Sequence, residues 1–325
     1  MIKLLHGDCL KRMAELEAES VSCVVTSPPY YGLRDYGHEG QIGLEQTPDE
    51  YVQKMVAVFR EVWRVLRKDG VVFLNLGDSY AGSGGAGNQF GQLEKNGFNK
   101  YKQNGKPKDI NLKPKDLIGI PWRVAFALQA DGWYLRQDII WHKPNPMPES
   151  VTDRCTKAHE YIFLLSKSQK YFYDAEAVKE KSTGNTKGAA ASFKRNGSKR
   201  GISICPNSPM PTHREDRELV AYDGESRNRR SVWTVSTKPF KGAHFAVFPE
   251  KLIEPCILAG CPKGGTVLDP FTGSGTSGIV AVKHGRNFIG CELNKEYLDM
   301  ANRRIWKAKQ SRGLLNYMEA KNVNC

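Results

Sequence analysis

The stretch GTVLDPFTGSGTSG, residues 265–278, joins a short apolar run to a turn that contains three glycines. Gly273, Gly275 and Gly278 form a G-x-G-x-x-G pattern directly after the apolar run, and the helix-forming segment TSGIVAVKHG follows. Glu292 closes the next apolar run, at about the spacing of 20 residues that is typical of nucleoside-binding units. A strand, a glycine turn, a helix and a distal acid therefore predict a cofactor site in a doubly wound fold.

Strands and helices alternate on both sides of this motif. Apolar runs predict further strands, and helical periodicity predicts helices at 48–68, 120–133, 248–261 and 294–310. The predicted strands are 2–8, 22–30, 70–80, 134–144, 159–174, 265–271 and 287–293. Several of these runs are continuously apolar, as in parallel strands that are covered on both faces. We expect an α/β fold with a doubly wound, mostly parallel, Rossmann-like sheet.

Two segments interrupt the alternation. Residues 81–116 are rich in glycine and poor in apolar side chains, so we expect a long mobile loop. Residues 175–240 have weak periodicity and are strongly basic: from Lys181 to Lys241 there are 13 Lys and Arg against 5 Asp and Glu. A solvated surface loop would also explain this composition, but clustered arginines favour contacts with phosphate.

The composition is that of a soluble globular protein, with 40% hydrophobic and 26% charged residues among 325. The first residues lack the apolar core of a signal peptide, and no run approaches the length of a membrane span, so we expect a cytoplasmic protein without a membrane partner. The 8 cysteines include no C-x-x-C pair, which argues against a structural metal and a disulfide framework. A net charge of +13 suits a polyanionic partner.

The residues before the glycines help to select the cofactor. Asp269 stands at the predicted strand end, where a carboxylate suits a cationic amino group better than a pyrophosphate. A ligand that combines a ribose with a charged amino-acid tail is S-adenosylmethionine. Asp8, at the end of another predicted strand, is placed to receive its adenine. An NAD-dependent oxidoreductase remains an alternative, whereas the lack of a G-K-S or G-K-T sequence excludes a P-loop enzyme.

A second motif lies near the other end of the chain. In VVTSPPYYG, residues 24–32, a predicted strand stops at Pro28 and Pro29, and Tyr30 follows directly. Consecutive prolines end strands in many proteins, so this motif alone would indicate only a strand terminator.

Together, DPFTGSGT and TSPPY closely resemble the hallmark pair of the amino DNA methyltransferases, which modify exocyclic nitrogens. The catalytic motif precedes the cofactor motif here, which is the order of the β class. The resemblance extends to WHKPNPMPESVTDR, HEYIFLLSK and HFAVFPEKLIEP, and it fades in 81–116 and 175–236. It implies a catalytic half in 1–174, a target-recognition insert in 175–240 and an S-adenosylmethionine-binding half in 241–325.

The resemblance also implies roles for individual residues. The methionine end of the cofactor should contact the turn, Glu292 should hold the ribose, and Asp8 should lie near the adenine. The turn residues are Asp269, Pro270, Phe271, Gly273, Gly275 and Thr276. His244, Phe245 and Pro249 should close the pocket, although His244 could equally be a packed or capping histidine and Phe271 a core residue.

The chemistry of an exocyclic amine gives a role to each residue of TSPPY. The amine lone pair is delocalised into the base, so catalysis needs acceptors that draw the amine hydrogens out of the ring plane. The proline carbonyls at the strand end should be free to accept, with Pro28 as the main candidate beside Pro29. Ser27 adds a hydroxyl acceptor, and Tyr30 a flat face for stacking the base. The target nucleotide must be flipped out of the duplex.

The expected partner is double-stranded DNA. Candidate phosphate contacts are Lys143, Lys194, Arg195, Arg227, Arg229 and Arg230. Trp141 could form a wall of the base pocket or belong to the core. A cognate restriction endonuclease, and the choice between monomer and homodimer, stay open.

Ser27, at the position where relatives carry Asp or Asn, favours the cytosine-N4 branch, with adenine-N6 as the main alternative. A non-catalytic DNA-binding protein is a further alternative. A cysteine mechanism at cytosine C5 is disfavoured because Pro255-Cys256 lies within an apolar helical pattern.

Overall fold

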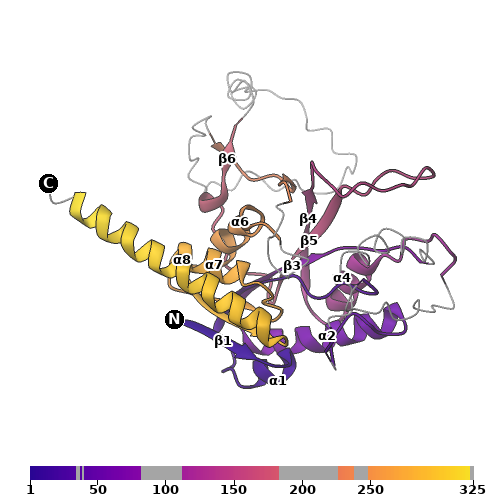
Figure 1. Ribbon diagram of the computed structural model, residues 1–325, viewed down its shortest axis with the longest axis horizontal. Helices are drawn as coiled ribbons and strands as arrows, with labels where there is room; N and C mark the ends of the chain where they lie inside the picture. Colours follow the sequence, from indigo (N-terminus) through magenta and orange to yellow (C-terminus); the bar gives the residue numbers. More distant parts are fainter. Residues whose placement is uncertain (34–36, 39, 82–111, 183–225, 238–247, 323–325) are drawn as a thin grey trace, which may run out of the picture. The chain divides into compact units, whose positions relative to one another are not determined.

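The computed structural model describes residues 1–33, 37–38, 40–81, 112–182, 226–237 and 248–322 (Figure 1). The chain divides into two compact units, of which the first comprises Met1–Ala177 with Arg230–Cys325 and the second Val178–Arg229. The first unit contains the sheet that the sequence predicts. The second falls within the predicted insert, and its described strands β6 (Glu180–Lys181) and β7 (Ser226–Arg227) pair antiparallel.

Eight described strands form the main sheet in the order β1-β10-β9-β2-β3-β5-β4-β8. They are β1 (Ile2–His6), β2 (Val21–Thr26), β3 (Leu66–Leu76), β4 (Tyr134–His142), β5 (His159–Ser166), β8 (Val232–Thr234), β9 (Thr266–Asp269) and β10 (Asn287–Glu292). The pairings from β1 to β3 are all parallel, β5 runs antiparallel to both of its neighbours, and β8 pairs parallel to β4. The prediction of a mostly parallel sheet is confirmed.

Helices cover the sheet in two groups. Helices α1 (Cys9–Ala14), α2 (Pro48–Val65) and α4 (Ile120–Ala130) form one group, in which α2 packs against both α1 and α4. These helices contact β10, β3 and β4, respectively. Helices α6 (Glu250–Gly260), α7 (Thr276–Lys283) and α8 (Lys295–Asn322) form a second group, drawn in orange and yellow in Figure 1. A short 3-10 helix, η1, spans Glu176–Val178. None of the described helices is long and apolar enough to cross a membrane.

Local sequence explains the best-defined helix, α2. Thr47 caps it by accepting from the backbone N–H of Glu50, Pro48 occupies the first turn, and two acids there complement the helix dipole. Tyr51, Met55, Val58, Phe59 and Val62 recur at helical spacing and are fully buried. This apolar stripe fixes which face of α2 meets the sheet.

The chain reverses its winding direction between β9 and β2. From β9 it proceeds to β10 on one side, whereas from β2 it proceeds to β3 on the other. Ligands of open α/β sheets bind at such a switch point, outside the carboxyl ends of the strands. Because β9 ends at Asp269 and β2 ends at Thr26, the two sequence motifs meet at this edge.

Candidate active site

A cavity opens at the carboxyl edge of the sheet, where β1, β2, β9 and β10 end. Its described lining includes Gly7–Cys9, Ser27–Tyr30, Pro270–Ser274 and Cys291–Asn294, together with Thr276. The glycine turn and the proline motif, predicted separately from the sequence, therefore face one cavity. Asp269 and Gly275 lie outside this described lining.

The glycine turn is held against the end of β10. The backbone N–H of Gly273 donates to Glu292 Oε2 at 2.7 Å, and the N–H of Asn294 donates to Oε1 at 2.9 Å. Gly275 adopts a φ of 81°, and a Cβ there would lie 2.8 Å from the Cβ of Ala301 on α8. The turn consequently requires glycine both for its backbone conformation and for helix packing.

Two carboxyl groups face the cavity from neighbouring strand ends. Burial raises the pKa of Glu292 above its ordinary range. Each oxygen of Glu292 accepts one backbone hydrogen bond, which leaves acceptor capacity for a ligand hydroxyl. Asp8 caps α1 by accepting from the N–H of Lys11 at 3.1 Å. Both residues line the cavity, and their contact with the nucleoside end of a cofactor stays a prediction.

Asp269 is 1% exposed and joins the two motifs. Its Oδ1 accepts from Thr26 Oγ1 at 2.7 Å and from the N–H of Phe271 at 3.1 Å, while Oδ2 accepts from Ser277 Oγ at 2.6 Å. Burial raises the pKa of Asp269 to about 6. Its contact with a cofactor amino group stays a prediction, but its hydrogen bonds show that it ties β2 to the glycine turn.

The two prolines of TSPPY differ in their surroundings. Tyr51, fully buried on α2, donates its hydroxyl hydrogen to the carbonyl of Pro29 at 2.9 Å. The Pro29 carbonyl is therefore partly engaged but keeps one lone pair for a further hydrogen bond, so this contact does not exclude the expectation that it can accept. Acceptance by the carbonyl of Pro28, the main candidate, also stays a prediction. Ser27, Pro28 and Pro29 all line the cavity.

Tyr30 is fixed on two sides. A Cβ placed on Gly77, just after β3, would lie 2.5 Å from Cε2 of the Tyr30 ring. The Tyr30 hydroxyl donates to Glu160 Oε2 at 2.7 Å, and burial together with the Glu160 charge raises the Tyr30 pKa. Tyr30 lines the cavity. Its orientation there is set by Gly77, directly after β3, and by Glu160 on β5.

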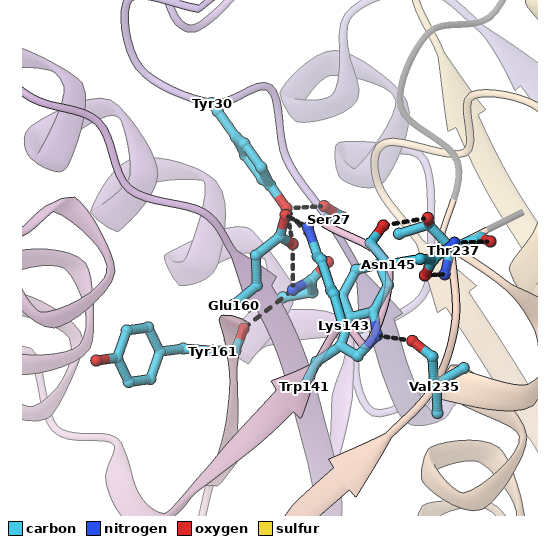
Figure 2. A network of polar contacts seen from close by, with 10 residues as sticks. Ser27, Tyr30, Trp141, Lys143, Asn145, Glu160, Tyr161, Val235 and Thr237 are labelled. Carbon is cyan, nitrogen blue, oxygen red and sulfur yellow. Dashed lines mark hydrogen bonds and ion pairs between the residues drawn. The ribbon is translucent and has the colours of Figure 1, made fainter. Parts of the chain in front are cut away.

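Lys143 forms an ion pair with Glu160, and its ammonium lies 4.4 Å from the ring centroid of Trp141 (Figure 2). Its side chain is 18% exposed, and its contact with a DNA phosphate stays a prediction. Trp141 is 4% exposed and donates to the carbonyl of Val235 at 2.7 Å. Of the two interpretations left open for Trp141, the structure supports the core residue.

Some of the remaining predicted site residues lie within the described part of the chain, and others lie outside it. Arg227 pairs with Glu180 at 2.8 Å within the second unit, and Arg230 is exposed. Arg229 is partly exposed. Lys194, Arg195, His244 and Phe245 lie outside the described residues. Pro249 occupies the N-cap position of α6 and lies outside the described lining, which its neighbour Phe248 joins.

Sequence reasoning missed Asn75, Gly77 and Glu160, which surround Tyr30. All three lie at the same edge of the sheet, because Leu76 near the end of β3 pairs with Tyr161 near the start of β5. Glu160 stands within HEYIFLLSK, a segment that belongs to the resemblance, yet nothing in the sequence alone connects it to TSPPY.

Comparison with known proteins identifies the family. The sequence model of the family described as DNA methylase, covering N6 and N4 enzymes, matches residues 21–303. The chain belongs to this DNA methylase family. It is 45% identical over 307 residues to the Type II methyltransferase M.SmaI of Serratia marcescens, covering 94% of this chain and 91% of that protein. It is 46% identical over 302 residues to M.Cfr9I of Citrobacter freundii, covering 93% and 87%.

Solved structures of DNA methylases share the fold. PvuII DNA methyltransferase (cytosine-N4-specific) matches with a TM-score of 0.59 and 20% identity, covering 96% of this chain and 91% of that one. TTHA0409 of Thermus thermophilus, solved with S-adenosyl-L-methionine, matches with a TM-score of 0.57 and 21% identity, covering 95% and 94%. The predictions of an amino DNA methyltransferase family and of a Rossmann-like fold are confirmed.

Proposed function

We propose that this DNA methyltransferase transfers a methyl group from S-adenosyl-L-methionine to the exocyclic N4 amine of a flipped-out cytosine in duplex DNA. The observation that carries the proposal is the meeting of Ser27-Pro28-Pro29-Tyr30 with the glycine turn in one cavity. A methyl donor held by the turn and a base held by the proline motif would be adjacent there. PvuII DNA methyltransferase, which shares the fold, is cytosine-N4-specific, and this agrees with the choice of cytosine N4.

The cavity fits this cofactor chemically. Glu292 retains acceptor capacity for ribose hydroxyls, and Asp8 lies at the neighbouring strand end. Pro270, Phe271 and Thr276 line the part of the cavity that the glycine turn forms. When bound, the cofactor supplies an electrophilic methyl group on a sulfonium centre.

The protein contributes acceptors and a stacking surface. Ser27 Oγ and the Pro28 carbonyl accept the two amine hydrogens and draw them out of the ring plane, so that the nitrogen lone pair becomes available. Tyr30 stacks against the base and holds it in line for displacement. The amine proton that is lost on methylation leaves toward these acceptors or solvent.

Double-stranded DNA is the substrate, and the basic residues of 175–240 contact its phosphates and read the target sequence. Arg230 and Arg229 are the described candidates, and Lys194 and Arg195 belong to the same proposal. Extrusion of the base costs a few kcal/mol, which these phosphate contacts offset. A cognate restriction endonuclease, a cytoplasmic location and a monomeric or dimeric state complete the proposal.

One experiment tests both the activity and the base. The protein is incubated with duplex DNA and S-adenosyl-L-methionine that carries a labelled methyl group, and the DNA is digested to nucleosides for mass spectrometry. We expect N4-methylcytosine. N6-methyladenine would instead establish the adenine alternative, and absence of label from both nucleosides would refute amine methylation.

A further inference from the structure

A chain of hydrogen bonds runs from the cavity into the protein (Figure 2). Ser27 Oγ donates to the Tyr30 hydroxyl oxygen at 3.4 Å. Tyr30 donates in turn to Glu160 Oε2 at 2.7 Å, and its oxygen lies 3.3 Å from Asn75 Oδ1. Four side chains from three different segments of the chain thereby connect the cavity edge to a part-buried carboxylate.

At the inner end of this chain of hydrogen bonds, the structure fixes which groups donate and which accept. Lys143 forms an ion pair with Glu160 through Oε1, and an ammonium group can only donate, so the Glu160 carboxylate acts as an acceptor. The amide nitrogen of Asn75 faces two acceptors, Glu160 Oε2 at 3.2 Å and the carbonyl of Tyr161 at 3.0 Å. A flipped amide would place its oxygen against both, so Asn75 Oδ1 must face Tyr30.

This polarity determines where the hydroxyl hydrogens lie. Tyr30 has one hydroxyl hydrogen, and both inner neighbours, Glu160 Oε2 and Asn75 Oδ1, can only accept it. The Tyr30 oxygen is therefore left to accept from Ser27. Once the hydrogen of Ser27 points at Tyr30, only lone pairs of Ser27 Oγ remain for the cavity.

We infer that Tyr30, Asn75 and Glu160 are positioning residues that hold the Ser27 hydroxyl as an obligate hydrogen-bond acceptor toward the target amine. The inference rests on the proposed role of Ser27 in amine methylation. A free serine hydroxyl can turn its hydrogen toward the base, where it would meet an amine hydrogen. A preorganised acceptor avoids that orientation before the base arrives, which is how fixed dipoles lower a barrier.

Two substitutions in the full-length protein test whether the Ser27 hydroxyl is held as an acceptor toward the cavity. Tyr30→Phe keeps the ring and removes the acceptor for the Ser27 hydrogen, and we expect kcat to fall about 10-fold. Glu160→Gln brings an amide whose oxygen faces Lys143 and whose NH2 faces Tyr30. The NH2 then donates to Tyr30, so that only Asn75 Oδ1, at 3.3 Å, still competes with Ser27 Oγ, at 3.4 Å, for the Tyr30 hydrogen. Where Tyr30 turns its hydrogen toward Ser27, the Ser27 hydrogen is displaced into the cavity. We expect a fall in kcat of about 10-fold, with the KM for DNA within about 3-fold of wild type.

A double-mutant cycle separates positioning from general structural damage. If Glu160 acts through Ser27, Glu160→Gln lowers the single-turnover rate in the wild-type background but leaves the rate of Ser27→Ala unchanged. An equal loss in both backgrounds would overturn the inference. Asp131→Asn is the matched control. Asp131 is a similarly shielded carboxylate, 16% exposed, that forms an ion pair with Arg60 at 2.6 Å. It lies outside the described lining of the cavity. We expect this control to retain the wild-type rate.

A binding measurement provides a readout that is independent of catalysis. In duplexes with cytosine or uracil at the target position, uracil presents a carbonyl where cytosine presents an amine. Lone pairs of Ser27 repel that carbonyl, so the wild-type protein discriminates against uracil. Glu160→Gln offers a hydrogen instead, and we expect the ratio of the two dissociation constants to fall about 10-fold, while Asp131→Asn leaves it unchanged. If adenine is the target, hypoxanthine replaces uracil in the test.

These outcomes distinguish the inference from the proposed function. If Ser27→Ala retains the wild-type kcat, the catalytic role of Ser27 fails, and the positioning role fails with it. If Ser27→Ala is impaired while Tyr30→Phe and Glu160→Gln keep kcat and base discrimination unchanged, only the positioning role fails. Urea unfolding of each variant verifies that the protein remains folded in every assay.

Discussion

Replacing Asp269 by Asn tests how the carboxylate joins the two motifs. Asn keeps an oxygen that can accept from Thr26 and from the N–H of Phe271. Its NH2 would face Ser277, whose hydroxyl can accept it and can donate to the carbonyl of Val25 instead, 3.4 Å away. The substitution therefore preserves the hydrogen-bonding pattern while it removes a buried negative charge.

The size of the effect follows from the pKa. Burial raises the pKa of Asp269 from 3.8 to about 6, so folding favours the protonated form. That stabilisation is complete below pH 3.8 and is lost as the pH rises through about 6. Between pH 8 and pH 5 the linkage amounts to about 1.4 kcal/mol, and between pH 8 and pH 4 to about 2.4 kcal/mol. The amide of the Asp269→Asn variant has no proton to exchange and lacks this dependence.

The assay is urea unfolding of both proteins without cofactor at several pH values. Subtracting the free energy of unfolding of wild type from that of Asp269→Asn cancels the other titrating groups. We expect the variant to gain about 1.4 kcal/mol relative to wild type as the pH rises from 5 to 8. A difference that stays constant with pH would refute the reasoning. Calorimetry with S-adenosyl-L-methionine then shows whether Asp269 also contacts the cofactor, in which case affinity falls in the variant.

Three further substitutions probe the cavity walls. Gly77→Ala places a Cβ 2.5 Å from the Tyr30 ring, so we expect kcat to fall about 10-fold with cofactor affinity retained in calorimetry. Tyr51→Phe leaves the Pro29 carbonyl without its buried donor, and urea unfolding should show a loss of about 1–3 kcal/mol. Glu292→Gln should weaken binding of S-adenosyl-L-methionine about 10-fold in calorimetry, because a neutral amide accepts ribose hydroxyls less strongly; an unchanged affinity would remove Glu292 from the site.

The cofactor half of the site could be predicted because its determinants are local. Gly273, Gly275 and Thr276 lie within one turn, and Glu292 follows at the end of the next strand, so spacing along the chain already encodes proximity in space. The requirement for glycine at 275 is likewise visible in the motif. Its packing reason, the approach of Ala301, becomes visible only in the structure.

The surroundings of Tyr30 could not be predicted because they depend on long-range pairing. Glu160 reaches Tyr30 only because β5 inserts antiparallel between β3 and β4, and an apolar run of eight residues does not reveal its direction. The short strand β8 was likewise hidden in the predicted insert, since Val232–Thr234 is too short to show a period. Lys143 was interpreted from charge alone, and its ion pair with Glu160 is visible only in the structure.

The two motifs meet although they lie near opposite ends of the chain. In a parallel sheet the carboxyl ends of neighbouring strands share an edge, whichever strand comes first in the sequence. Thr26 and Asp269 are 243 residues apart, yet the pairing of β2 with β9 brings their side chains within 2.7 Å. A buried hydrogen bond to a carboxylate at this joint couples the position of Ser27, the next residue along, to that of the glycine turn. In the proposed mechanism, the alignment of base and methyl donor would thus depend on a contact that neither motif contains by itself.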